Sequence, residues 1–189
     1  MTLSTLWHVA YYAWIASEVF IAIATRTRYS SGNVRDRGTL YLLWIVIFGS
    51  ITAGSWFSET HEPNLFHGAA WLRSVALIVL IAGLALRWTA VLSLGKSFSS
   101  NVAIHETQRV IKTGLYGWMR HPSYTGLLLC IYAAALHTRN WVSVLIIVVP
   151  TTAALLYRIH VEEIALRGHF GEEYVEYSRM TKRLLPGIY

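Results

Sequence analysis

The sequence contains one cysteine and few charged residues, and both shortages exclude classes of protein. The single cysteine, Cys130, excludes an internal disulfide and any zinc site made of cysteines alone. Charged residues are 14% of the 189 residues, against about 25% in globular proteins, and apolar residues are 54%. Disorder needs low hydrophobicity and high charge, and a soluble domain needs polar residues over its surface. The length and composition therefore predict one domain, placed in a membrane.

Sequence motifs for nucleotide and metal binding are missing or incomplete. No G-x-G-x-x-G is present, and Gly95-Lys96-Ser97 has Ala90 where a phosphate-binding loop needs glycine. His105-Glu106 begins a zinc-protease pattern, but Arg109 stands where the second histidine belongs. Four histidines have spacings that match no standard ligand set: His105, His121, His160 and His169. We therefore expect no metal and no Rossmann nucleotide site.

Five apolar runs organise the chain, and four are long enough to cross a bilayer, which takes about 17–25 residues. The fourth run is short and spans only if Pro122 and Ser123 open its helix near the interface, since proline suits the first helical position. The first run carries Glu18 and no preceding basic residues, so we do not expect a cleaved signal peptide. The runs are Leu6–Thr25, Leu40–Phe57, Ser74–Leu94, Tyr124–Leu136 and Trp141–Tyr157. They predict an all-α integral membrane protein with five transmembrane helices.

Basic residues gather on one side of these runs and predict the topology. Four lie between runs one and two, four between runs three and four, and five after run five. Cytoplasmic loops carry an excess of Lys and Arg, so we expect the N-terminus outside and the C-terminus in the cytosol. The net charge of +6 then marks a face near anionic lipid, with no nucleic-acid partner. A soluble cofactor must meet the inner segments, Gly95–Ser123 and Arg158–Tyr189.

Two ionisable residues, Glu18 and Arg87, lie inside predicted spans. Each costs at least about 2.5–3.5 kcal/mol at the bilayer centre, so each needs a partner or a function. Both stand seven residues from the inner end of their run, which is roughly 10 Å of helix. Either the two pair as a structural bridge, or Arg87 presents its guanidinium to a substrate anion such as a carboxylate.

Further polar groups lie at the inner ends of spans. Arg158 precedes Glu162 by four residues, so the two share a face if the helix continues, either as a surface ion pair or as part of a site. The segment Arg120-His121-Pro122-Ser123-Tyr124 combines a cation, an imidazole and a helix start. A helix N-terminus binds anions, but the same residues also suit an interfacial anchor with arginine at the headgroups.

The stretch Gly114-Leu-Tyr-Gly-Trp-Met-Arg-His-Pro-Ser-Tyr-Thr-Gly126 closely resembles the signature of isoprenylcysteine carboxyl methyltransferases. Arg158 with Glu162-Glu163, then Phe170–Tyr177, then Pro186 match that family in order and spacing. Phospholipid methyltransferases and some membrane reductases share parts of this pattern. The combination is specific, and it covers roughly the second half of the chain.

The resemblance implies an integral membrane enzyme whose S-adenosylmethionine pocket lies on the cytosolic side. Arg87 and Arg158 match arginines that are important for activity in the family, and they are the expected catalytic residues. Glu162 or Glu163 is expected to bind the cofactor's ammonium, and His121 its carboxylate. The cofactor contacts carried over by motif are Gln108, Val110, Ile111, Tyr116, His121, Tyr124, Glu162 and Glu163.

Two positions depart from the family pattern. The family usually has His-x-Leu-Val where this chain has Gln108-Arg109-Val110-Ile111, which would preserve main-chain contacts but not side-chain ones. Met180 stands where a basic residue is common before Thr181. The match leaves the first two spans and the outer loop, residues 1–70, uncovered. We expect a catalytic core in residues 71–189 within one membrane domain, residues 1–189.

The expected reaction is methylation of the carboxylate of a lipophilic, isoprenylcysteine-like or prenylated acceptor. A carboxylate with a pKa near about 4 needs no general base, so the enzyme must only gather the reactants and exclude water. N-methylation of an aminophospholipid headgroup is an alternative that two arginines disfavour, and a non-enzymatic membrane protein of the same fold is another. The compact size resembles prokaryotic members, which suggests a bacterial or archaeal inner membrane with the site facing the cytosol.

Overall fold

The computed structural model of the chain is a bundle of helices and describes residues 2–25, 33–34, 38–61, 71–95, 98, 103–104 and 110–184. The α-helices are α1 (Leu3–Ala24), α2 (Thr39–Thr60), α3 (Trp71–Leu94), α4 (Pro122–His137), α5 (Trp141–Phe170) and α6 (Glu172–Met180). A 3-10 helix, η3, covers Gly114–Gly117. Two short strands, β1 (Asn33–Val34) and β2 (Ala103–Ile104), pair antiparallel.

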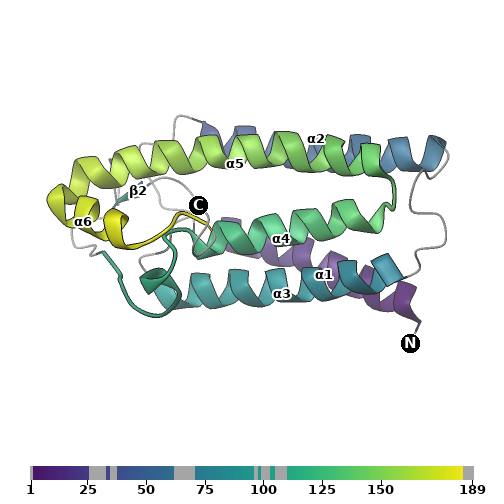
Figure 1. Cartoon of the computed structure of the whole chain (residues 1–189), viewed down its shortest axis with the longest axis horizontal. Coiled ribbons are helices and arrows are strands. Elements are labelled where there is room, and N and C mark those ends of the chain that lie inside the picture. The colour runs from purple at the N-terminus through teal and green to yellow at the C-terminus, as the bar shows by residue number, and fades with distance from the viewer. Residues whose placement is uncertain are drawn as a thin grey trace.

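The long helices run side by side along the molecule's long axis (Figure 1). In the bundle α4 packs closely on α3, α5 packs on α2 and α4, and α1 packs on α3. The short helix α6 lies beside the end of α5, at the end of the bundle opposite the start of α1 (Figure 1). The inner segments that follow α3 and α5 therefore meet at one end of the molecule.

The apolar runs predicted from the sequence are helices in the structure. Four of them, α1, α2, α3 and α5, are long and apolar enough to cross a membrane. Helix α4 begins at Pro122 as predicted, but it has only 16 residues, and most of it is buried between its neighbours. That α4 also spans the membrane, which would make five spans, therefore stays a prediction. Helix α5 continues past its apolar run to Phe170, as the placement of Arg158 and Glu162 on one face required.

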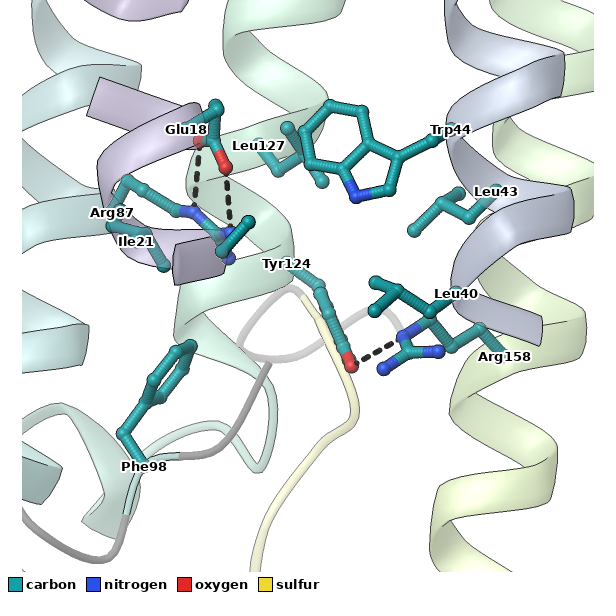
Figure 2. A pocket seen from close by; sticks show the side chains of 11 residues that line it. Glu18, Ile21, Leu40, Leu43, Trp44, Arg87, Phe98, Tyr124, Leu127 and Arg158 are labelled. Carbon is teal, nitrogen blue, oxygen red and sulfur yellow. Dashed lines mark hydrogen bonds and ion pairs between the residues drawn. The ribbon is translucent and has the colours of Figure 1, made fainter. Parts of the chain in front are cut away.

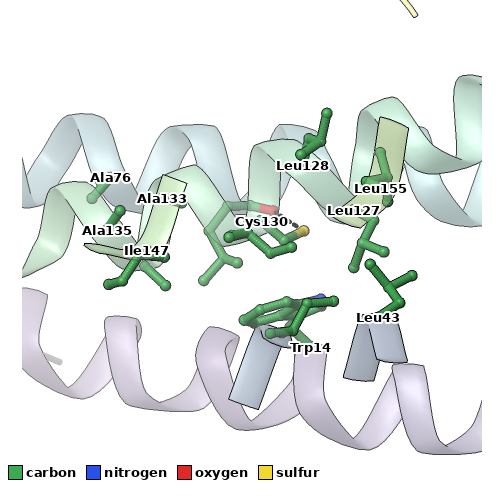
Figure 3. Packing of buried hydrophobic residues seen from close by; sticks show 14 of the residues in the cluster. Trp14, Leu43, Ala76, Leu127, Leu128, Cys130, Ala133, Ala135, Ile147 and Leu155 are labelled. Atoms are coloured by element: carbon green, nitrogen blue, oxygen red, sulfur yellow. Dashed lines mark hydrogen bonds between the residues drawn. The ribbon is translucent and has the colours of Figure 1, made fainter. Parts of the chain in front are cut away.

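Apolar residues cover the outside of the bundle as well as its core. Inside, Trp14, Cys130 and Ile147 belong to one buried apolar cluster and are almost completely unexposed (Figure 3). Outside, Ile23 and Ile45 are at least 70% exposed, on helices that have no polar face toward solvent. A helix that is apolar all round belongs in a large core or a membrane. The structure therefore agrees with an integral membrane protein.

Helices α3 and α4 approach so closely that only glycine fits at their crossing. A Cβ on Gly126 would stand 2.6 Å from the backbone nitrogen of Arg87 and 2.8 Å from the carbonyl oxygen of Gly83. A Cβ on Gly83 would meet the backbone nitrogen of Cys130 at 2.9 Å. Because backbone atoms cannot rotate away, this crossing sets the position of Arg87 relative to α4.

We expect Gly126→Ala to lower the free energy of unfolding by about 1–3 kcal/mol, because the added methyl overpacks the crossing. The same change should reduce activity by displacing Arg87. Gly49→Ala is the matched control, since a Cβ there meets nothing within 4 Å and alanine favours a helix by up to about 1 kcal/mol. Thermal unfolding of both variants in detergent compares them, and equal melting temperatures would contradict the prediction.

Candidate functional site

A small, partly open cavity of about 30 Å³ lies among α1, α2, α3, α4 and α5. Figure 2 shows Glu18 and Arg87 on one side of it and Tyr124 with Arg158 on the other. Side chains of α2, among them Trp44, close it toward that helix. The two arginines that the sequence analysis singled out therefore line one cavity, although they are 71 positions apart in the sequence.

Arg87 is bound on both edges of its guanidinium. Its Nε and Nη2 atoms donate to the two carboxylate oxygens of Glu18 at 3.0 and 2.8 Å. Its Nη1 donates to the carbonyl oxygen of Ser123 at 3.2 Å and also to the Ser123 hydroxyl. Arg87 is 5% exposed and Glu18 3%, so the buried charges are paired as burial requires. The bridge between helices, one of the two alternatives left open by the sequence, is thus present.

Arg158 lies on the other side of the cavity and is held by two hydroxyl groups. Its Nε donates to the Tyr124 hydroxyl at 3.0 Å, and its Nη1 donates to Thr39 Oγ1 at 2.8 Å. The Tyr124 hydroxyl in turn donates to Glu162 Oε2 at 2.6 Å. Arg158 is 1% exposed, so the interpretation of a surface ion pair with Glu162 is wrong. Arg158 instead lines the cavity, and the Tyr124 hydroxyl lies between its guanidinium and the Glu162 carboxylate.

Glu163 is the centre of a separate cluster of positive charges beyond the cavity. Its Oε1 accepts from Arg120 Nε at 2.9 Å, its Oε2 accepts from Arg183 Nε at 3.1 Å, and Arg183 Nη2 lies 3.0 Å from Oε2. Arg167 Nη2 lies 3.5 Å from Oε2. His121 Nε2 lies 3.5 Å from Oε1, beyond the usual N–H···O range of about 2.7–3.2 Å. Both oxygens of this 2% exposed carboxylate are therefore engaged by the protein itself.

The Arg120 side chain is buried, so the alternative in which it anchors the chain among lipid headgroups is wrong. Besides Glu163, its Nη1 donates to the carbonyl oxygens of Ser178, at 2.9 Å, and Thr181. This guanidinium joins the loop before α4, helix α5 and the end of α6 at one point. The charge of Arg120 is compensated inside the protein by the Glu163 carboxylate.

The segment after α6 lies along the loop that leads into α4. The backbone nitrogens of Arg120 and His121 donate to the carbonyl oxygens of Lys182 and Arg183 at 2.8 and 3.0 Å. Thr125 Oγ1 donates to the carbonyl oxygen of Leu184 at 2.8 Å. These contacts hold the C-terminal segment over the start of α4, next to the cavity residue Tyr124.

Tyr116 and Tyr177 fasten the 3-10 helix to the rest of this end of the molecule. Tyr177 donates its hydroxyl to the Tyr116 carbonyl oxygen at 2.6 Å, and Tyr116 donates its own to the Ala90 carbonyl oxygen at 3.3 Å. Burial raises the pKa of Tyr177 to about 12, with Arg120 acting in the opposite direction, and burial also raises the pKa of Tyr116. Both phenols are therefore neutral hydrogen-bond donors at neutral pH.

Comparison with known proteins supports the family resemblance independently. The sequence model of the isoprenylcysteine carboxyl methyltransferase (ICMT) family matches residues 75–168. Protein-S-isoprenylcysteine O-methyltransferase B of Arabidopsis thaliana is 32% identical over 120 residues, which are 62% of this chain and 61% of that protein. The Rattus norvegicus protein-S-isoprenylcysteine O-methyltransferase is 30% identical over 140 residues, which are 71% of this chain and 49% of the rat protein. This chain belongs to the ICMT family.

A solved structure agrees with the assignment to the ICMT family. The eukaryotic intramembrane Ras methyltransferase ICMT superposes with a TM-score of 0.66 and 27% sequence identity, over 75% of this chain and 52% of that chain. This chain thus spans about three fifths of the Arabidopsis relative and about half of the rat relative and of the solved structure. The fold of an ICMT membrane enzyme and four apolar helices of spanning length identify an integral membrane protein.

The site residues carried over from the ICMT family fall into three groups. Arg87, Arg158 and Tyr124 line the cavity, and Glu162 adjoins it through Tyr124. His121, Tyr116 and Glu163 lie at the α6 end of the bundle, where His121 stacks on Tyr124 with ring centroids 5.6 Å apart. Val110 and Ile111 are half-buried in the loop before η3. Gln108 lies outside the described residues.

Sequence reasoning missed most of the partners of these residues. Thr39, the first residue of α2, contacts Arg158 across 119 positions, and Ser123 anchors Arg87 across 36. Arg183 contacts Glu163, although the sequence counted it only as cytosolic charge. No sequence signal marks Thr39 or Ser123, because one hydroxyl residue near a helix start is common.

Within the described residues no cluster of three His, Cys, Asp or Glu side chains suits a metal ion, and His105 lies outside them.

Proposed function

We propose that this ICMT-family protein transfers a methyl group from S-adenosylmethionine to the carboxylate of a lipophilic, isoprenylcysteine-like acceptor. The observation that carries the proposal is that two buried arginines line a cavity that adjoins an apolar groove. Arg87 and Arg158 line one cavity, and guanidinium groups bind carboxylates through paired N–H donors. The cavity shares Glu18, Ala22 and Trp44 with a larger groove between α1 and α2.

The groove suits the hydrocarbon part of such an acceptor. It has a volume of about 340 Å³, and its lining residues are apolar apart from Glu18 and the hydroxyls of Tyr11 and Thr52. A ligand pocket for a lipophilic molecule is lined mainly by apolar side chains, with a few polar groups that fix orientation. An acceptor with its chain in the groove would place its carboxylate at the arginine-lined cavity.

The residues near Tyr124 fit the amino acid part of S-adenosylmethionine. Glu162 is half-buried, one of its oxygens accepts from Tyr124, and within the described residues no hydrogen bond is recorded for the other. That free oxygen suits an ammonium group. His121 Nε2 is buried and has no hydrogen bond of normal length, which suits a carboxylate. Glu163 is a poorer ligand than Glu162, because the protein's own arginines hold both of its oxygens.

The protein's own residues have three tasks in this reaction. S-adenosylmethionine, when bound, supplies a methyl group on a positively charged sulfur. Arg158 and Arg87 orient the acceptor carboxylate, which is already ionised and needs no base. The Tyr124 hydroxyl ties Arg158 to Glu162, so the acceptor side and the cofactor side keep one relative position. Burial excludes water, which would otherwise shield the carboxylate.

We place the site on the cytosolic side of a five-span membrane protein, with the N-terminus outside. The cluster around Glu163 and the C-terminal segment lie at the same end as the site, and this end holds most of the basic residues that the structure describes. Positive residues favour the cytosolic side. Helix α4, with Pro122 at its start, would be the fourth and shortest span.

The test uses membranes that contain the full chain, methyl-labelled S-adenosylmethionine and an N-acetylated prenylcysteine. Base-labile, volatile label in the acceptor is the expected result, because methyl esters release methanol in base. Base-stable label on an aminophospholipid would instead support N-methylation. Absence of both, together with absence of cofactor binding in detergent, would support a protein without methyltransferase activity.

A further inference from the structure

One edge of the Arg87 guanidinium already holds a carboxylate that belongs to the chain. Nε and Nη2 of Arg87 donate to the two oxygens of Glu18 at 3.0 and 2.8 Å. A free carboxylate ligand binds a guanidinium through the same paired geometry. Within the described part of the chain, Arg87 is the one recorded hydrogen-bond partner of the Glu18 carboxylate. Glu18 therefore stands where an acceptor carboxylate would bind Arg87.

The other edge of Arg87 is anchored independently of Glu18. Its Nη1 donates to the carbonyl oxygen and the hydroxyl of Ser123, at the start of α4. The close crossing at Gly126 also fixes the backbone of Arg87. Exchange of one carboxylate for another at the Nε and Nη2 edge would therefore leave the guanidinium in the same orientation.

Glu18 also stands where the two hollow spaces meet. It lines both the arginine-lined cavity and the apolar groove between α1 and α2. Its helix, α1, packs on α3, while the groove runs along its face toward α2. An acceptor chain in the groove would thus bring its carboxylate to the Glu18–Arg87 pair before it reached Arg158.

We infer that Glu18 is a specificity-determining residue whose carboxylate competes with the acceptor carboxylate for Arg87. The inference rests on the proposed function and adds a property to the same site. A buried carboxylate that loses its partner is costly, so every acceptor must overcome the displacement of Glu18. Acceptors with a long apolar chain do so by filling the groove, since each buried methylene adds favourable free energy. Short, water-soluble carboxylates do not.

The decisive variant is Glu18→Gln, which keeps one hydrogen-bond acceptor for Arg87 but removes the competing charge. We expect KM for a fifteen-carbon prenylcysteine to fall by about tenfold, because a charge-assisted pair no longer has to be broken. The Kd of the matching prenylcysteine carboxamide, which carries no charge, should stay within about twofold. A ten-carbon acceptor should gain more in relative activity than the fifteen-carbon one.

Glu18→Asp keeps the charge and shortens the side chain, so it should lower KM by a smaller factor than Glu18→Gln does. It replaces Glu18→Gln as the test if that variant does not fold. Glu59→Gln, at the exposed far end of α2, is the matched control and should change nothing. An unchanged or higher KM in both Glu18 variants, with normal cofactor binding and melting temperature, would make Glu18 a structural bridge only. Equal gains for carboxylate and carboxamide would also overturn the inference. A wild-type protein that forms no methyl ester would instead contradict the proposed function.

Discussion

Replacing Arg158 with lysine is expected to lower kcat/KM for the acceptor by about a hundredfold or more, while cofactor affinity stays nearly unchanged. Arg158 is 1% exposed and is held by Tyr124 and Thr39 on two of its nitrogens. Lysine keeps the charge but has no planar pair of donors, so it cannot hold both hydroxyls and orient a carboxylate. The loss should therefore appear in turnover of a correctly folded protein.

The measurements for Arg158→Lys are steady-state methyl transfer, calorimetric binding of S-adenosylmethionine and thermal unfolding in detergent. Arg73→Lys is the matched control, because Arg73 is exposed in the first turn of α3, 14 residues before Arg87. If cofactor affinity fell in step with turnover, Arg158 would serve the cofactor rather than the acceptor. Wild-type turnover in Arg158→Lys would remove it from the site altogether.

Replacing Glu163 with glutamine is expected to be the most destabilising single change. Glu163 is 2% exposed and binds Arg120 and Arg183 at 2.9 and 3.0 Å. Removing one partner of a buried ion pair costs about 3–5 kcal/mol, because the remaining charges lose their compensation. For a chain of this size that corresponds to a fall in melting temperature of about 10 °C or more. Trypsin should then cut the released C-terminal segment faster near Lys182.

Two neighbouring glutamates provide controls for Glu163→Gln. Glu173 forms a half-exposed ion pair with Lys112 at 3.1 Å, so Glu173→Gln should change stability by less than about 1 kcal/mol. Glu162→Gln should leave the melting temperature almost unchanged but weaken S-adenosylmethionine binding, since its free oxygen is the proposed ammonium ligand. If Glu162→Gln and Glu163→Gln gave the same two effects, the division of roles between the adjacent residues would be wrong.

The helices could be predicted from the sequence because their signals are local. Runs of apolar residues marked α1, α2, α3 and α5, and Pro122 marked the start of α4. The motif around Arg120 to Tyr124, with Glu162 and Glu163 downstream, was enough to indicate the ICMT family, which the comparisons support. Arg87 stood out because a charge inside a span needs an explanation.

Most partners of these residues could not be predicted, because each depends on how two distant helices are rotated toward one another. Arg158 meets Thr39 across 119 positions, and the sequence left open whether Glu18 would pair with Arg87 across 69. Glu162 and Glu163 are adjacent in the sequence, yet one points to Tyr124 and the other to Arg120. Successive residues on a helix are about 100° apart, so neighbours face different surroundings.

The sequence by itself determined that this is a helical membrane protein of the ICMT family with Arg87 and Arg158 as candidate site residues, because hydrophobic runs and short motifs are local features of the chain. Only the tertiary structure decided that both arginines line one cavity, that Glu18 already holds one of them and that Glu163 fastens the C-terminal segment. The reason is physical: a buried charge takes its function from the groups packed around it, and those groups come from helices that the chain brings together only when it folds.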